Sequence, residues 1–199
     1  MINISYIILF AALSICKLNA QQTFSIEQYS DHIVNHRVLP SDVNKIIDEN
    51  NSFDPFIGIW SGELNGIDYQ FYISKTSESD EFYDQFEYLE VRYLISDGAA
   101  ILSDTRQEDS DEISIFLNYM PNITTSHFKV IDGDDCNSDM TGAFHLVGSP
   151  STGPVLGTVF NEMEVAFQEI PDLFIENRCP NGPTANQFPK DVIFTLTKQ

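Results

Sequence analysis

Residues 56–75 read FIGIWSGELNGIDYQFYISK, and they show their secondary structure more clearly than any other stretch of the chain. Apolar side chains recur at every second position on either side of a central Asn65-Gly66 pair. That period places alternate side chains on one face of a β-strand. Asn-Gly favours the two-residue turn of a β-hairpin, because both residues tolerate positive φ angles. The stretch therefore predicts two antiparallel strands joined by a tight turn.

The alternation of apolar and polar residues continues to the C-terminus. A second turn dipeptide, Asp97-Gly98, separates two such runs, and the last run includes Leu196. Strands in this order predict an all-β fold, an antiparallel up-and-down meander that closes into a barrel and leaves no free sheet edge. A two-sheet sandwich is the alternative. We expect the strands near residues 57–64, 67–75, 87–96, 99–104, 112–119, 126–131, 140–147, 154–160, 163–169 and 190–198.

The residues before this β-region follow a different period. Ser25-Ile26-Glu27 and residues 40–47 combine helix-capping side chains with apolar residues three to four positions apart. They predict two short helices on either side of the bend at Pro40. We therefore expect a helical N-terminal segment at 21–52 and a β-barrel domain at 53–199.

Residues 1–20 are typical of a cleavable signal peptide. Residues 2–16 are mostly apolar, and Ala20 stands before a polar Gln21-Gln22. We expect cleavage after Ala20, export to the periplasm or the extracellular space, and no membrane insertion afterwards. A permanent anchor is the weaker interpretation, because a bilayer span needs about 20 apolar residues. Attachment of a lipid to Cys16 is a further alternative.

Two cysteines remain after the expected cleavage, Cys136 and Cys179. An even number of cysteines in an oxidising compartment is typical of a disulfide bond. The alternative is a metal site, which neither a Cys-x-x-Cys pair nor a nearby histidine supports. The sequence therefore predicts one bridge between these two residues.

The sequence around the first strand resembles a protein family. Phe56-Ile57-Gly58-Ile59-Trp60 is similar to the Gly-x-Trp strand that follows a short helical segment in lipocalin-like (calycin-type) barrels. The resemblance implies structural roles for Gly58 and Trp60, with the indole packed at the closed end of the barrel against a basic residue, here Lys198. Lipocalins carry a long lid loop where this chain has Asn65-Gly66, which argues against a roofed ligand cavity. The wider pattern also resembles secreted Bacteroidetes-type families of unknown function.

Acidic residues outnumber basic ones by thirty to ten, which gives a formal net charge of −20. Such a chain repels nucleic acid and anionic lipid, so neither is an expected partner. Successive connections of a meander alternate between its two ends, which predicts that Asn65-Gly66, Asp97-Gly98 and the turns at 121–125 and 148–153 share one end. That rule would bring the acidic connections at 76–86, 105–111 and 132–139 to one rim, where they would attract a cation or a basic protein. The alternative is a solvated acidic face.

The candidate metal and catalytic residues form less specific patterns. Asp132, Asp134 and Asp135 are a candidate calcium site, because this cation prefers carboxylate and carbonyl oxygens. His32 and His36 would share one face of a helix, but they lack a third metal ligand. No Gly-x-Ser-x-Gly elbow, phosphate-binding loop or dinucleotide motif occurs.

Three functional hypotheses follow. We expect a secreted non-enzymatic binding protein that holds an unknown protein or small ligand, with no cofactor other than the candidate calcium ion. The first alternative is an acidic inhibitor-like protein that docks a cationic protein partner. The second alternative is a hydrolase with a carboxylate pair, which requires a carboxyl group with a raised pKa inside a pocket.

Overall fold

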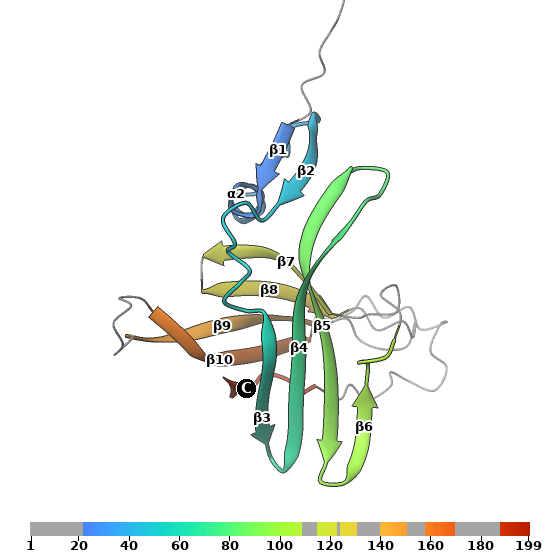
Figure 1. Ribbon diagram of the computed structural model, residues 1–199, viewed down its shortest axis with the longest axis vertical. Helices are drawn as coiled ribbons and strands as arrows, with labels where there is room; N and C mark the ends of the chain where they lie inside the picture. The colour runs from blue at the N-terminus through green and yellow to red at the C-terminus, as the bar shows by residue number, and fades with distance from the viewer. Residues whose placement is uncertain (1–21, 109–114, 123, 131–139, 151–157, 170–187) are drawn as a thin grey trace, which may run out of the picture.

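The computed structural model describes residues 22–108, 115–122, 124–130, 140–150, 158–169 and 188–199 (Figure 1). Most of these residues belong to strands, so the expected all-β class is confirmed. The elements are β1 (Gln22–Ser25), α2 (Ile26–Val34), β2 (Val43–Ile47), β3 (Gly58–Leu64), β4 (Ile67–Glu78), β5 (Gln85–Asp97), β6 (Ala100–Asp104), β7 (Ile115–Asn122), β8 (Thr125–Val130), β9 (Met140–Pro150), β10 (Thr158–Glu169) and β11 (Ile193–Lys198).

The strands form one sheet that curls into a half-barrel, with β3, β4 and β5 crossing in front of β7 to β10 (Figure 1). Neighbouring strands follow the order β1-β2-β5-β4-β3-β11-β10-β9-β8-β7, and β6 pairs with β5. Most pairs are antiparallel, but β2 runs parallel to both β1 and β5. The sheet is therefore mixed, whereas the sequence predicted a purely antiparallel one.

One edge of β5 receives three strands in succession. β2 pairs with it at residues 85–86, β7 at 89–91 and β6 at 94–97. β6 is therefore a side branch, whereas the sequence predicted a place for it in the consecutive meander. Thr105 marks the end of this branch: its backbone N–H donates to Tyr93 O at 2.9 Å, and its hydroxyl accepts from Tyr93 N at 2.8 Å. Beyond this point β7 occupies the edge of β5.

The side branch changes where the later connections lie. β6 and β7 are both antiparallel to β5, so they run in the same direction. The turn after Pro121 therefore lies at the β4–β5 end of the sheet, and the prediction that it lies beside Asn65-Gly66 is wrong. Asp97-Gly98 does share the end of Asn65-Gly66, since Ile67 pairs with Asp97. The alternation rule therefore fails at the turn after Pro121. Residues 109–111 and 132–139 of the acidic connections lie outside the described part of the chain, so the acidic rim stays a prediction.

The N-terminal segment holds one helix rather than the two expected. α2 begins with a capping box, in which Gln28 N donates to Ser25 Oγ and Ser25 N donates to Gln28 Oε1. The second expected helix is strand β2, where Ile46 is fully buried and pairs with Phe86 of β5. Valine and isoleucine favour strands, and pairing with β1 and β5 decides between two conformations that the apolar spacing allowed.

A single strand, β10, replaces two predicted ones. The sequence predicted strands at 154–160 and 163–169 with a turn between them. β10 instead pairs with β9 on both sides of Asn161, and the register shifts between Phe160 and Glu162. Asn161 is therefore a β-bulge, which interrupts the apolar alternation without reversing the chain.

Aromatic rings fill the space inside the curled sheet. The centre of the Phe71 ring lies 5.8 Å from that of Phe144 and 6.3 Å from that of Phe167. Phe188, which precedes β11, stacks 4.5 Å from Phe167 and lies 4.9 Å from Tyr93. All five side chains are buried, and we call them the interior aromatic cluster. Burial of such a side chain stabilises the fold by about 1.5–3 kcal/mol.

Candidate functional site

The residues of the family resemblance meet where β3 lies beside β11. Lys198 pairs with Trp60 across these strands, and its ammonium group lies 5.1 Å from the centre of the Trp60 ring. Lys198 Nζ also donates to Pro55 O at 3.2 Å, while Trp60 Nε1 donates to Phe56 O at 2.7 Å. Trp60 is fully buried. These contacts tie the first strand of the β-region to the last.

Gly58 makes room for the lysine. Its φ of 137° is one that side chains other than glycine rarely adopt, and a Cβ there would lie 3.0 Å from Lys198 Cε. Burial lowers the pKa of Lys198. The close approach of the lysine stem to the backbone explains why glycine occupies this position.

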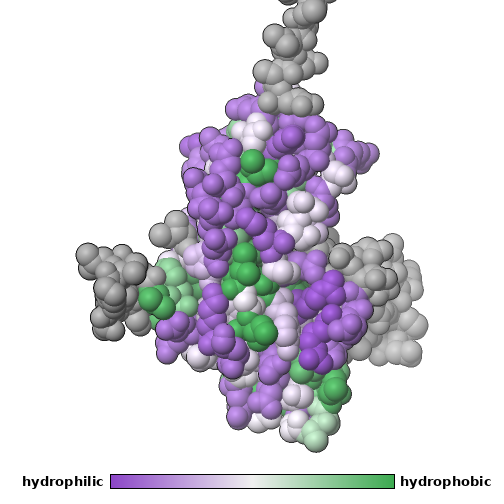
Figure 2. Space-filling view, viewed as in Figure 1, coloured by the Kyte–Doolittle hydropathy of each residue, from purple (hydrophilic) through white to green (hydrophobic). Residues whose placement is uncertain are grey.

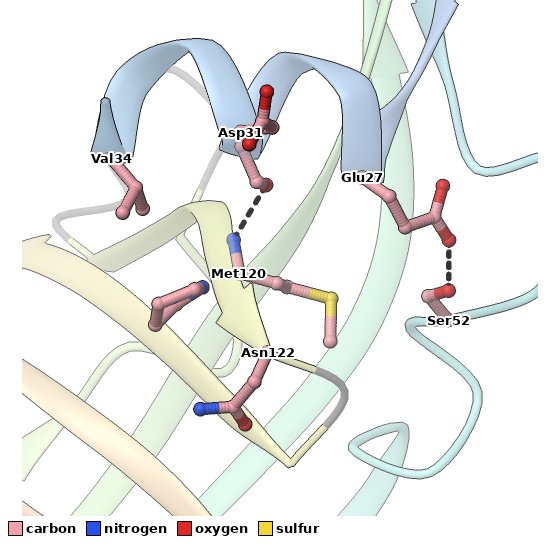
Figure 3. A pocket seen from close by; sticks show the side chains of 8 residues that line it. Glu27, Asp31, Val34, Ser52, Met120 and Asn122 are labelled. Atoms are coloured by element: carbon pink, nitrogen blue, oxygen red, sulfur yellow. Dashed lines mark hydrogen bonds between the residues drawn. The ribbon is translucent and has the colours of Figure 1, made fainter. Parts of the chain in front are cut away.

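A pocket lies between α2 and the end of β7 (Figure 3). Its volume is about 270 Å³, and we call it the α2–β7 pocket. Most of its surface is apolar, with a few polar groups. The residues that line it are Glu27, Ser30, Asp31, Val34, Ser52, Met120, Pro121 and Asn122.

Ser30 holds the helix against the strand. Its hydroxyl donates to Ile26 O at 2.7 Å and accepts from Met120 N at 2.8 Å (Figure 3). Ser30 and Met120 are both buried, at 2% and 5% exposure. Leaving a buried N–H without an acceptor costs about 1–3 kcal/mol, so this bond fixes the distance between the two walls of the pocket.

Glu27 supplies negative charge to the pocket. Ser52 Oγ donates a short hydrogen bond to Glu27 Oε1 (Figure 3). Burial raises the pKa of Glu27, but hydrogen bonds with Ser25, Ser52, its own backbone and Asn50 outweigh burial and lower the pKa overall. The first turn of a helix also favours an anion, because the helix dipole is positive there. The carboxyl group is therefore ionised at neutral pH.

Asp31 lies at the rim and already has partners. Arg37 Nη1 donates to Asp31 Oδ2 at 2.8 Å, and Asn35 Nδ2 donates to Asp31 Oδ1 at 2.7 Å. The carboxylate points away from Met120 in Figure 3. An exposed ion pair of this kind contributes about 0–1 kcal/mol. The Asp31 carboxylate is therefore already engaged by Arg37 and Asn35.

A buried carboxylate fixes the position of Ser52. The Asp48 side chain has no exposed surface and accepts from Ser52 N at 2.7 Å and from Phe53 N at 3.2 Å. Lys75 Nζ lies 3.4 Å from Asp48 Oδ2 and offsets its charge. The hydrogen bonds to Asp48 thus fix the loop that carries Ser52. This wall of the pocket is therefore preorganised for a ligand.

Several predicted residues lie outside the described part of the chain and stay predictions. They are the signal peptide at 1–20, the calcium candidates Asp132, Asp134 and Asp135, and the disulfide pair Cys136 and Cys179. Within the described ranges, no group of three His, Cys, Asp or Glu residues could hold a metal ion. His32 lies on α2, whereas His36 follows the helix with a φ of 52°, so the two do not share a helical face. An unchanged urea midpoint at millimolar calcium would remove the calcium prediction.

The sequence analysis missed the α2–β7 pocket. Its walls come from residues 27–34, Ser52 and residues 120–122, which no local pattern relates to one another. The only available signal was Ser25-Ile26-Glu27, which correctly marked the start of the helix. The alternation rule placed the turn after Pro121 at the wrong end of the sheet and so hid its approach to the helix.

No family model, no curated protein and no solved structure matches this chain. Of the helical residues that the structure describes, none belongs to a helix with the length and apolar character needed to cross a bilayer.

Proposed function

We propose that this chain is a secreted, non-enzymatic binding protein on a lipocalin-like barrel, and that the α2–β7 pocket holds a small ligand. The pocket is the observation that carries the proposal. Val34, Met120 and Pro121 give apolar surface to a space of about 270 Å³, and polar groups lie around it. Small-molecule sites in proteins have this composition. A cavity of about 150 Å³ already accommodates benzene, so the volume suffices for a small organic ligand.

The proposed barrel is closed. A ring of strand pairs supports closure: β5, β4, β3, β11, β10, β9, β8 and β7 pair in turn, and residues 89–91 of β5 pair with residues 115–117 of β7. The contact between Lys198 and Trp60 lies where the resemblance to lipocalins implies it. In this arrangement β1, β2 and β6 are additions outside the ring.

The proposed ligand binds beside α2 rather than among the interior rings. Eight-stranded barrels can hold one small ligand in their interior. Here the interior aromatic cluster occupies the space between the two sides of the curled sheet. The α2–β7 pocket lies where the end of β7 meets the helix, and none of these rings lines it (Figure 3).

Electrostatics restrict the class of ligand. The Glu27 carboxylate borders the pocket, and the chain carries a net charge of −20. Both repel an anion. We therefore propose a small, mainly apolar ligand that is neutral or cationic.

Three aromatic probes of similar size test this proposal: benzyl alcohol, benzylamine and benzoate. We expect the first two to shift the amide resonances of residues that line the pocket, with dissociation constants of about 1 mM, as for other very small ligands. Benzoate should bind more weakly because of its charge. Equal binding of benzoate would contradict the proposed ligand class.

A matched pair of variants tests the location of the site. Val34→Trp fills the pocket and should abolish binding of benzyl alcohol and benzylamine. Val38→Trp places the same side chain at a position that is 91% exposed and does not line the pocket, so binding should remain. Unchanged binding in Val34→Trp would show that the pocket is not the site.

An acidic inhibitor-like protein that docks a cationic protein partner is the second candidate. The net charge of −20 favours it, and so does the connection between β4 and β5, where the exposed Glu78, Asp80 and Glu81 stand close in sequence to an exposed phenylalanine. Added salt weakens such an association, whereas it leaves the binding of neutral benzyl alcohol unchanged. Salt dependence therefore separates the two candidates.

The geometry does not favour a hydrolase. A carboxyl group that acts as a general acid needs a raised pKa. The pKa of Glu27 in the pocket is lowered instead, and the hydrogen bond with Arg106 lowers that of Asp104. The proposal is therefore a binding protein without catalysis.

Export and the bridge between Cys136 and Cys179 complete the proposal. The intact mass of the secreted protein should correspond to a chain that begins at Gln21. Reduction should add two hydrogen atoms to that mass. A mature chain that begins at Met1, or two free thiols in the secreted protein, would remove this part of the proposal.

A further inference from the structure

We infer that the tip of the β4–β5 hairpin, residues 79–84, is a docking surface for a protein that presents an apolar socket bordered by lysine or arginine. This surface lies apart from the α2–β7 pocket and uses none of its residues. The inference rests on the second candidate function and gives it a location and an anchor residue. If the experiment below contradicts it, the proposal that the α2–β7 pocket binds a small ligand is unaffected.

The tip presents a large apolar side chain to solvent. Phe82 is 70% exposed, and the hairpin projects beyond the half-barrel beside β2 (Figure 1). Most of the surface seen in Figure 2 is hydrophilic, with apolar residues in small separate patches. Single exposed apolar residues are normal on proteins, so the exposure of Phe82 alone does not mark a docking surface. The fixed backbone around Phe82 and the charges beside it are the further observations.

The backbone around Phe82 is fixed by one carboxylate. Phe82 N and Tyr83 N both donate to Asp80 Oδ1 at 2.7 Å. Asp80 N donates to Tyr83 O at 3.0 Å and closes the turn. A turn that is already ordered loses little conformational entropy on binding, which favours affinity.

The residues that follow the turn anchor it to the N-terminal elements. Asp84 N donates to Asn44 O at 2.8 Å, and Asn44 Nδ2 donates to Asp84 Oδ2 at 2.6 Å. The Tyr83 ring lies 5.5 Å from that of Phe86, which in turn lies 5.5 Å from that of Tyr29 on α2. Tyr83 thus packs back onto the protein, while Phe82 projects from a supported tip.

The charges around Phe82 define the partner. Glu78, Asp80 and Glu81 are exposed, and in the described part of the chain none of the three forms an ion pair. A buried aromatic anchor surrounded by polar contacts is the usual arrangement of an interaction hot spot, and complementary charge steers the encounter. A cationic protein surface fits this tip. A second copy of the chain, with its net charge of −20, does not.

A displayed library of random peptides serves as the probe, selected on the secreted protein at low salt. We expect the enriched peptides to combine lysine or arginine with apolar residues. Phe82→Ala should weaken their binding by at least about tenfold, as expected for an anchor residue. Raising the salt from about 0.05 M to about 0.5 M should also weaken it, because the carboxylates are exposed.

Two controls separate the outcomes. Val38→Ala removes another exposed apolar side chain and should leave peptide binding unchanged, as should Val34→Trp in the pocket. Phe82→Ala should keep the melting temperature of the unchanged protein, because its ring is mostly in water. Peptides that bind Phe82→Ala as tightly as the unchanged protein, or a library that yields none beyond those bound by the bare support, would overturn the inference. Loss of both the peptides and benzyl alcohol in Val34→Trp would place the peptides in the pocket and would also overturn it.

Discussion

The interior aromatic cluster and the α2–β7 pocket use apolar side chains in opposite ways. Inside the curled sheet, rings such as Phe167 and Phe188 stack 4.5 Å apart and are buried. Beside α2, Val34 and Pro121 border a space of about 270 Å³. The first region stabilises the fold, while the second leaves apolar surface that a ligand can cover. The comparison is the reason we propose that a ligand binds beside the helix rather than among the interior rings.

The largest expected effect is the loss of stability when a ring of the interior aromatic cluster is removed. Phe167→Ala should lower the free energy of unfolding by about 3–5 kcal/mol, because it leaves a cavity among rings that contact one another. Unfolding in urea measures this loss. Val159→Ala, on the same strand but 44% exposed, should change stability by less than about 0.5 kcal/mol. A loss in Phe167→Ala no greater than in this control would mean that the interior is not packed by aromatic rings.

A smaller effect is expected where the pocket joins the sheet. Ser30→Ala should lower the free energy of unfolding by about 1–3 kcal/mol, because it leaves the buried Met120 N–H without an acceptor. It should also weaken the binding of benzyl alcohol, since the helix then loses its fixed distance from β7. Ser77→Ala, at an exposed position on β4, is the control. Wild-type stability and binding in Ser30→Ala would show that this hydrogen bond does not shape the pocket.

The smallest expected effect concerns alkaline pH and the tyrosines beside the β4–β5 hairpin. Burial, followed by the charges of Glu78 and Glu90 and a hydrogen bond with Glu78, raises the pKa of Tyr88 to about 12. The folded protein therefore keeps the Tyr88 proton when the unfolded chain, with a pKa of about 10, has lost it. The stability that neutral Tyr88 contributes is fully present below about pH 10 and is lost as the pH rises toward about 12.

Tyr88→Phe removes this titration. The free energy of unfolding should fall less steeply between about pH 10 and about pH 12 in this variant than in the unchanged protein. Identical slopes for the two proteins would contradict the raised pKa.

The strands of the curled sheet could be predicted because each carries its own signal. β3 and β4 follow the apolar alternation closely, and Asn65 and Gly66 have the positive φ angles, 55° and 85°, that the Asn-Gly pair predicted. The start of α2 could be predicted for the same reason, since a capping box is a local pattern. Local signals of this kind survive into the structure whenever no distant partner competes with them.

The remaining features depend on contacts between distant residues. β2 is a strand because it pairs with β1 and β5, although its apolar spacing also fitted a helix. The pairing of β6 with β5 ends where Thr105 forms hydrogen bonds with Tyr93. The pocket depends on Ser30 meeting Met120, ninety positions along the chain. No pattern within a short window of sequence contains these pairs.

Methyl resonances of two buried methionines test the central comparison most directly. Met120 lines the α2–β7 pocket, whereas Met163 of β10 is fully buried and is not among the residues that line it. Protein labelled with ¹³C at the methionine methyl groups should be titrated with benzyl alcohol. A ligand in the pocket should shift the Met120 resonance and leave that of Met163 in place. A shift of Met163 with Met120 unmoved would show that ligands enter the interior instead.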